Sequence, residues 1–181
     1  MVRDLDHPSL PAPLALADGR AVLRRAVRDD VPAIAALLAE DQLGRRREDV
    51  DDPAARAAYL AAFDAVDADP AHDLLVAVLG SDVPGGEVVA TTQVTYLPGL
   101  SRRGALRAQV EAVRVAAAHR SSGLGSAMIR WVEHEARRRG CALVQLTTDA
   151  ARDDAHRFYE RLGFVASHRG FKLLLQDEAG P

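Results

Sequence analysis

The period of apolar and polar residues changes along the chain, and these changes locate the expected helices and strands. Residues 20–27 have the composition of a first strand. Apolar residues then recur at helical spacing over 29–38 and again over 55–66, which predicts two helices joined by a charged connection at 44–53. Pro32 lies in the first turn of the first helix, where the N–H that proline lacks would have no helical partner.

The period shortens in the middle of the chain. Residues 73–80 form an apolar run, residues 87–97 are β-branched and alternating, and residues 107–117 are again β-like, so we expect three strands. A helical period returns over 123–139. This helix ends in three consecutive arginines followed by Gly140, which suits a helix C-terminus because cations there meet the negative end of the helix dipole.

The last part of the chain alternates strand and helix. We expect a short apolar strand over 141–148, a helix over 151–163 that Gly163 closes, and one or two final strands over 164–175. The order of strands and helices predicts at least one right-handed β-α-β unit in the second half of the chain. The fold class expected from the residues is therefore mixed α/β.

The length of 181 residues is typical of one domain. We expect residues 1–18, which contain acids and three prolines, to form a flexible N-terminal tail, and residues 19–176 to form a single domain. The tail lacks the basic flank and apolar block of a signal peptide, and no window approaches the apolar length of a membrane span. No internal repeat is visible.

Charge and cysteine content exclude several function classes. The net charge of −3 gives no electrostatic reason to expect nucleic acid or an acidic membrane as a partner. Cys141 is the single cysteine, so no intramolecular disulfide is expected, and this fits a cytoplasmic location. The six histidines do not fall into a metal-ligand spacing, so we expect no metal site.

The segment HRSSGLGSAMIRW, residues 119–131, stands between an expected strand and an expected helix. A helix N-terminus offers unpaired N–H groups and the positive end of a dipole. Gly123 and Gly125 lack a Cβ, so a ligand can approach the backbone closely. These features predict an anion site, and a tight turn with a serine N-cap is the alternative. The segment lacks the Gly-Lys-Ser/Thr ending of a nucleotide P-loop.

Two sequence motifs of this chain resemble those of a known family. Arg120-x-x-Gly123-x-Gly125, preceded by VEAVRVAA, resembles the acetyl-CoA-binding motif of the GNAT superfamily of N-acetyltransferases. ARDDAHRFYERLGF, residues 151–164, resembles the next motif of that superfamily. The element order also agrees, so the resemblance covers about 85% of the chain. It implies a mostly antiparallel central sheet with a splayed parallel strand pair and about four flanking helices.

The resemblance implies acetyl-CoA as co-substrate and assigns residues to it. Backbone N–H groups of the loop would bind the CoA pyrophosphate, with Arg120 nearby as charge support. The strand before the loop would splay from its neighbour at a bulge, and pantetheine amides would lie along it like an added strand. The loop residues are Ser121, Ser122, Gly123, Leu124, Gly125 and Ser126, and the strand residues are Val113, Arg114 and Val115.

The resemblance also implies two catalytic residues. The amine acceptor is mostly protonated at neutral pH and needs a base before it attacks the thioester. Glu111 resembles the strand glutamate that many relatives use as base, often through water, and alternation would place it on the face of Val113 and Val115. Tyr159 matches the usual acid. Glu111 as a solvated strand carboxylate and Tyr159 as a core aromatic beside Phe158 are the alternatives. A backbone N–H near Val115 would stabilise the oxyanion.

One position departs from the family pattern. Many relatives carry an asparagine that contacts pantetheine where this chain has Arg152. Its guanidinium would either reach a CoA phosphate or cap the helix together with Asp153 and Asp154. His156 lies one turn before Tyr159, where it would face either solvent or CoA.

The same resemblance implies that residues 44–63 and 97–107 determine which acceptor binds. Five arginines in these segments would either attract an acidic acceptor or form a solvated mixed-charge surface, and three aromatic residues would either line an apolar pocket or pack in the core. The arginines are Arg45, Arg46, Arg47, Arg102 and Arg103, and the aromatic residues are Tyr59, Phe63 and Tyr96.

We expect an N-acetyltransferase that acts on a small-molecule primary amine. Acetylation of a protein N-terminus or lysine, and a non-catalytic acyl-CoA-binding module, are the alternatives. Homodimers are common in the family, although no residue of this chain indicates one.

Overall fold

The computed structural model describes most of the chain in two compact units, residues 1–146 and residues 147–181. Each unit is described by itself. The described residues are 9–16, 19–40, 48, 50–80, 86–173 and 175. Among them, no helix combines the length and the apolar character that crossing a membrane requires.

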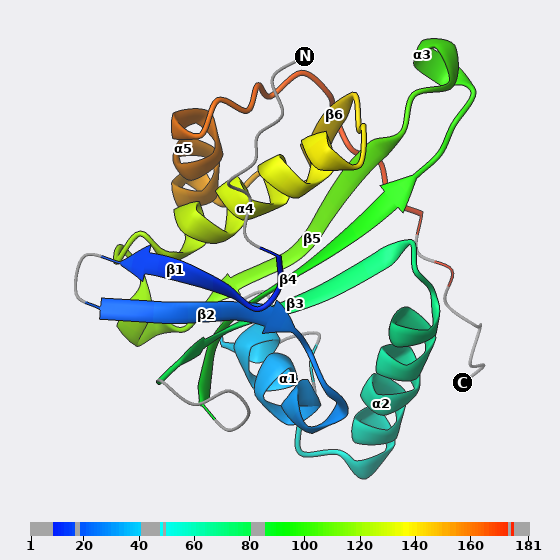
Figure 1. Cartoon of the computed structure of the whole chain (residues 1–181). Helices are drawn as coiled ribbons and strands as arrows, with labels where there is room; N and C mark the ends of the chain where they lie inside the picture. Colours follow the sequence, from blue (N-terminus) through cyan, green and yellow to red (C-terminus); the bar gives the residue numbers. More distant parts are fainter. Residues whose placement is uncertain are drawn as a thin grey trace. The chain divides into compact units, whose positions relative to one another are not determined.

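The first unit is built on a six-stranded sheet whose strands lie side by side in chain order (Figure 1). Neighbouring strands are antiparallel except for the last two, which are parallel. The fold is therefore mixed α/β, as expected, with a mostly antiparallel sheet and one parallel pair. The strands are β1 (Ala12–Leu16), β2 (Gly19–Arg25), β3 (His72–Leu79), β4 (Glu87–Leu97), β5 (Arg107–Val115) and β6 (Leu143–Leu146).

Helices cover both faces of this sheet. On one face, α1 (Val31–Ala39) and α2 (Pro53–Ala68) form an apolar cluster with β3, in which Ile34 and Phe63 pack with Val76. On the other face lies α4 (Leu124–Arg138), which connects β5 to the parallel β6 and so completes the expected β-α-β unit (Figure 1). Shorter turns are η1 (Arg28–Asp30), α3 (Ser101–Gly104) and η3 (Ala117–His119).

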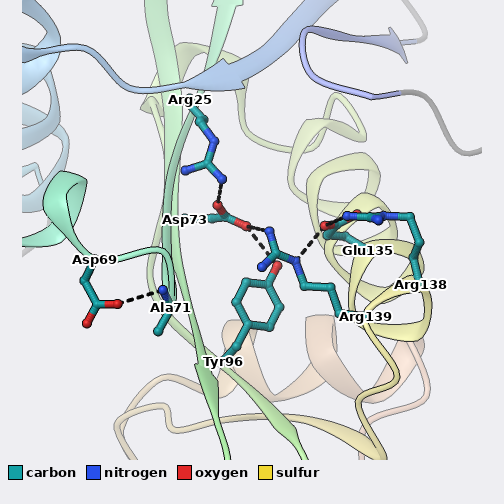
Figure 2. Close-up of polar contacts among 8 residues, drawn as sticks. All are labelled: Arg25, Asp69, Ala71, Asp73, Tyr96, Glu135, Arg138 and Arg139. Carbon is teal, nitrogen blue, oxygen red and sulfur yellow. Dashed lines mark hydrogen bonds and ion pairs between the residues drawn. The ribbon is translucent and has the colours of Figure 1, made fainter.

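A group of charged side chains ties α4 to the sheet (Figure 2). Asp73 of β3 is 1% exposed, and its Oδ2 accepts hydrogen bonds from Tyr96 Oη at 3.0 Å and from Arg139 Nη2 at 3.2 Å. Its other oxygen pairs with Arg25 of β2. The guanidinium of Arg139 lies 4.0 Å from the centre of the Tyr96 ring, a cation–π contact.

The same group continues into α4 through Glu135. Its carboxylate accepts hydrogen bonds from Arg138 at 2.6 and 2.7 Å and from Arg139 at 2.7 Å. Burial by itself would raise the pKa of Glu135, but these two arginines outweigh it and hold the pKa at about 2. Burial raises the pKa of the Tyr96 hydroxyl, and the charge of Asp73 raises it further. Tyr96 is therefore neutral and Glu135 ionised at neutral pH.

The expected tail contains a strand. Residues 12–16 form β1, which pairs with β2 and buries Ala12 and Leu14 at 0% and 5% exposure. Pro13 is unfavourable in most strands because it has no backbone N–H to donate to a neighbouring strand. It is tolerated here because β1 is the edge strand, with a partner on one side.

The expected final strands are absent from the second unit as far as it is described. Its helix α5 (Asp153–Arg161) was expected, but residues 164–173 contain no strand. Val165, Phe171 and Leu173 are 81–95% exposed. Within 164–173 the prediction of a strand was wrong, because a β-prone sequence forms a strand only where a neighbouring strand supplies hydrogen bonds and packing.

Replacement of Asp73 tests the link between α4 and the sheet. We expect Asp73→Ala to lower the free energy of unfolding by about 3 kcal/mol, because it removes the buried acceptor of the Tyr96 hydroxyl and one of the two carboxylates that pair with Arg139. Asp64→Ala is the control, since Asp64 pairs with Arg28 at an exposed site and should cost less than about 1 kcal/mol. Urea denaturation measures both variants, and equal losses would contradict a special role for Asp73.

The pH dependence of stability tests the environment of Glu135. Its pKa in the folded chain is about 2, against an ordinary value of 4.5. The unfolded state therefore binds a proton first as the pH falls, so the contribution of Glu135 is complete above pH 4.5 and is lost between 4.5 and about 2. Thermal melts across this window should show a steeper loss for the native chain than for Glu135→Gln, and parallel curves would argue against the lowered pKa.

Candidate active site

A bulge interrupts β5 where the sequence predicts the active site. Gln93 pairs with Glu111, but the next pair is Thr91 with Arg114, so two residues of β5 lie opposite one of β4. Ala112 takes up the extra residue with a φ of 53°, in the left-handed region that favours glycine.

The bulge coincides with the separation of the two parallel strands. The last pair of β5 with β6 is Val110 with Leu146, while β5 continues to Val115. The N–H of Ala116 donates to a carbonyl of β4 at 2.8 Å. Because the backbone direction alternates along a strand, Val113 and Val115 point their N–H and C=O groups away from β4. This stretch of β5 is therefore an edge that can accept an extended ligand.

Arginine side chains occupy the two carbonyls of this edge. Arg114 Nη1 donates to the carbonyl of Val113 at 2.9 Å, and Arg120 Nε donates to that of Val115 at 3.1 Å. Both cations thus lie at the edge predicted to hold pantetheine.

The loop after β5 leads into α4 through a glycine. Gly123 is the N-cap of α4 with a φ of 89°, and its position carries no side-chain cap bond. Ser122 Oγ donates to the carbonyl of His119 at 2.7 Å and accepts weakly from Leu124 N at 3.4 Å. The first N–H groups of a helix have no acceptor within it. The loop therefore combines the expected anion-binding end of a helix with only a weak serine cap.

Glu40 at the end of α1 holds this loop, a contact that no sequence pattern predicts. Its carboxylate accepts from Ala117 N at 3.0 and 3.1 Å and from Arg120 Nη2 at 3.0 Å. Arg120 thus bridges Glu40 and the end of β5. The role that the resemblance implies for it, charge support near the CoA pyrophosphate, stays a prediction. Glu40 and Arg120 are 80 positions apart in the chain, so only the fold could join them.

Glu111 is exposed and lies on the sheet face that α1 and α2 cover in part. Its neighbours Ala108 and Val110 are 0% and 1% exposed on the α4 face, which sets Glu111 on the opposite one. The expectation that Val113 and Val115 share this face was wrong, because the bulge shifts the alternation by one residue. Arg114 shares the face of Glu111 instead.

A row of polar side chains crosses the same face beside Glu111. His72, Thr95, Gln109 and Gln145 lie in register on four neighbouring strands. His72 Nδ1 lies 2.9 Å from Thr95 Oγ1, and Gln145 Nε2 donates to Gln109 Oε1 at 2.7 Å. This face therefore carries hydrogen-bonding groups next to the candidate base.

The remaining predicted site residues belong to the second unit. The Tyr159 ring packs edge-on against Phe158 at 5.0 Å and Phe164 at 5.7 Å between ring centres. Arg152 is the N-cap residue of α5 without a side-chain cap bond, and His156 Nε2 lies 3.1 Å from the carbonyl of Asp149. The pairing of Tyr159 with Glu111 across the two units stays a prediction.

The aromatic residues proposed for an acceptor pocket lie in packed surroundings. Phe63 belongs to the core cluster, and Tyr59 packs against it. Tyr96 is 5% exposed on the opposite face, with Asp73 and Arg139. Arg102 and Arg103 are exposed on α3, and residues 45–47 lie outside the described part of the chain. In that part no three His, Cys, Asp or Glu side chains gather in a way that could hold a metal ion.

Comparison with known proteins identifies a family and a fold. The model of the acetyltransferase (GNAT) family matches residues 33–164. The crystal structure of a transcriptional regulator from Bacillus halodurans C-125 is 41% identical, covers 86% of this chain and 99% of its own, and superposes with a TM-score of 0.79. An acetyltransferase of Trypanosoma brucei has 24% identity, covers 86% of this chain and 99% of its own, and has a TM-score of 0.67, which shows the shared fold.

A curated relative matches over a shorter stretch. The aminoalkylphosphonate N-acetyltransferase of Salmonella typhimurium is 45% identical over 56 residues, which are 31% of this chain and 36% of that protein. The match thus spans about a third of that relative's length.

Replacement of Ala112 by glycine tests the bulge. A non-glycine residue in the left-handed region costs about 1–2 kcal/mol, while glycine adds an entropic cost of about 0.5–1 kcal/mol. We expect Ala112→Gly to leave the free energy of unfolding unchanged or to raise it by up to about 1 kcal/mol. Ala90→Gly, at a fully buried position of β4, should lower it. Similar losses in both variants would mean that Ala112 is not in the left-handed conformation.

Proposed function

Because the chain belongs to the acetyltransferase (GNAT) family and is thus an acyltransferase, we propose that it transfers the acetyl group of acetyl-CoA to a primary amine of a small molecule. The two substrates meet in a ternary complex, and the amine attacks the thioester directly. The observation that carries the proposal is the bulge at Ala112. Glu111, the candidate base, lies directly before the bulge, and the part of β5 that is not paired with β6 continues directly after it.

The residues of the first unit fit acetyl-CoA as donor. Backbone groups of Val113, Arg114 and Val115 would bind the pantetheine amides, since Val113 and Val115 turn theirs away from β4. N–H groups from Ser121 to Ser126 would bind the pyrophosphate at the start of α4. Arg120 and Arg114 would supply positive charge after releasing the carbonyls they now bind. Bound there, acetyl-CoA supplies an activated acetyl group. Arg152 and His156 of the second unit would extend this site.

Glu111 is proposed as the base. Its carboxylate is exposed at the bulge, where a bound ammonium could lose a proton to it directly or through one water. Tyr159 is proposed as the acid that protonates the leaving thiolate. Its ring lies between Phe158 and Phe164, which would fix its orientation.

A small-molecule acceptor is supported by the Salmonella relative, whose name specifies aminoalkylphosphonates. The proposal includes a cytoplasmic location, which the single Cys141 supports because it allows no intramolecular disulfide. A non-catalytic acyl-CoA-binding module is the second candidate, because the Bacillus halodurans relative is described as a transcriptional regulator.

Turnover with acetyl-CoA and a panel of primary amines, followed as free thiol, tests the proposal. We expect Glu111→Gln and Tyr159→Phe each to lower kcat by about 100-fold, the contribution typical of a general base or acid. Neither variant should change the dissociation constant of acetyl-CoA measured by calorimetry.

Glu133→Gln, on the α4 surface in an exposed pair with Arg137, is the control and should keep full activity. Tight binding of acetyl-CoA without turnover of any amine would favour the non-catalytic module. Turnover restricted to lysine-containing peptides would favour a protein acetyltransferase.

A further inference from the structure

Arg107, the first residue of β5, is a cation without a counter-charge in the described part of the chain. Its side chain is half-buried, and its Nε is buried without a hydrogen-bond partner. No Asp or Glu in that part pairs with it. Arg24, which is more deeply buried and whose Nε also lacks a partner, has its charge paired with Asp30, and Arg139 pairs with Asp73. A guanidinium N–H withdrawn from water without a partner is destabilising, so such a site favours an anion.

Arg107 lies on the face of the sheet that carries Glu111. Residues 107, 109 and 111 precede the bulge and alternate with the buried Ala108 and Val110. Their side chains therefore project from one face. The Cα atoms of Arg107 and Glu111 are about 13 Å apart, since four residues of strand separate them.

The guanidinium of Arg107 extends toward the connection that precedes β5. Its Nη2 lies 3.7 Å from the position that a Cβ would take on Gly99. On the sheet, Arg107 lies in register between Leu97 and Leu143, whose side chains are apolar. The cation thus has apolar neighbours on both adjacent strands, which strengthens its attraction for an anion.

The polar row fills the distance between the two charges. Gln109, hydrogen-bonded to Gln145, lies between Arg107 and Glu111 on β5, and Thr95, bonded to His72, is its partner on β4. One face thus carries a carboxylate at one end, neutral hydrogen-bonding groups in the middle and a cation at the other end.

We propose that Arg107 selects the acceptor by binding an anionic group, a carboxylate or a phosphonate, at the end of the molecule opposite its amine. The planar guanidinium binds such groups through two parallel hydrogen bonds. The amine then lies at Glu111, and the middle of the acceptor lies along the polar row. This inference rests on the proposed function and adds the chemical class of the acceptor, an extended amine with a terminal anion.

Matched acceptors test it in the full-length chain with acetyl-CoA. Each set contains an ω-amino carboxylate, an ω-amino phosphonate and an ω-amino alcohol of equal length. The native chain should have a kcat/KM for the anionic members about 10- to 100-fold above that for the alcohol, as expected for charge-assisted hydrogen bonds. The preference should grow with chain length until the acceptor spans the two charges.

Arg107→Gln should remove this preference by raising the KM for anionic acceptors, while kcat and the KM for acetyl-CoA stay unchanged. Arg107→Lys should restore part of it, because the charge remains and the second parallel hydrogen bond is lost. Arg107→Met should melt at a higher temperature than the native chain, since an unpaired half-buried cation is removed. A purely structural role for Arg107 predicts a lower melting temperature instead.

Arg130→Gln is the matched control, because Arg130 is exposed on α4 and pairs with Glu133. It should keep the preference for anionic acceptors. Turnover of amines with equal kcat/KM for the alcohol and its anionic partners would overturn the role of Arg107 and leave the proposed function intact. Tight acetyl-CoA binding with no turnover of any amine would overturn both.

Discussion

The separation of β5 from β6 is the constraint on which the candidate site depends. Pairing ends at Val110 because the bulge at Ala112 turns the strand at the point where β6 ends. The N–H and C=O groups beyond the bulge would otherwise be used by a neighbouring strand, and a buried polar group without a partner is costly. The fold satisfies the carbonyls of Val113 and Val115 with arginine side chains. An extended ligand that brings its own amides can take the place of these arginines, so the interruption that weakens the sheet creates a binding edge.

Helix α4 adds its N-terminus to the binding edge of β5, so the candidate site has two parts. Its C-terminal residues are held to β3 and β4 through Asp73, Tyr96 and Arg139, which fixes the helix on the sheet. Its N-terminus begins at Gly123, after the loop that follows Val115 of β5, so its first N–H groups follow the strand edge along the chain. The loop between β5 and α4 is held by Glu40, which follows α1 on the face of the sheet opposite α4. Charge pairs thus place each end of α4, while the apolar contacts between α4 and the sheet supply the bulk of the stability.

Local patterns predicted the elements well where a single period decides the structure. The helices over 53–68 and 124–138 and the four strands over 72–115 and 143–146 lie where clear apolar periods within each segment predict them. Predictions failed where a neighbour decides. Strand β1 forms despite Pro13 because β2 lies beside it, and residues 164–173 stay without a strand despite their β-prone sequence. The predicted sheet face for the Val113 side chain was also wrong. Ala112 adopts a left-handed conformation that the sequence does not indicate, and this shifts the alternation of the residues after it.

The sequence by itself determined the mixed α/β class and the glycine that starts α4, because these depend on residue types at short spacing. Its motifs also carry the family resemblance that implies Glu111 as a candidate base. Only the tertiary structure decided which residues share a face and which charges find partners. Glu40 joins Arg120 across 80 positions, and Arg107 finds no carboxylate among the described residues. Hydrogen bonds and ion pairs act over a few ångströms in space and are indifferent to separation along the chain. That Arg107 has no counter-charge in the described part of the chain, from which the class of acceptor is inferred, therefore appears only once the strands are in register.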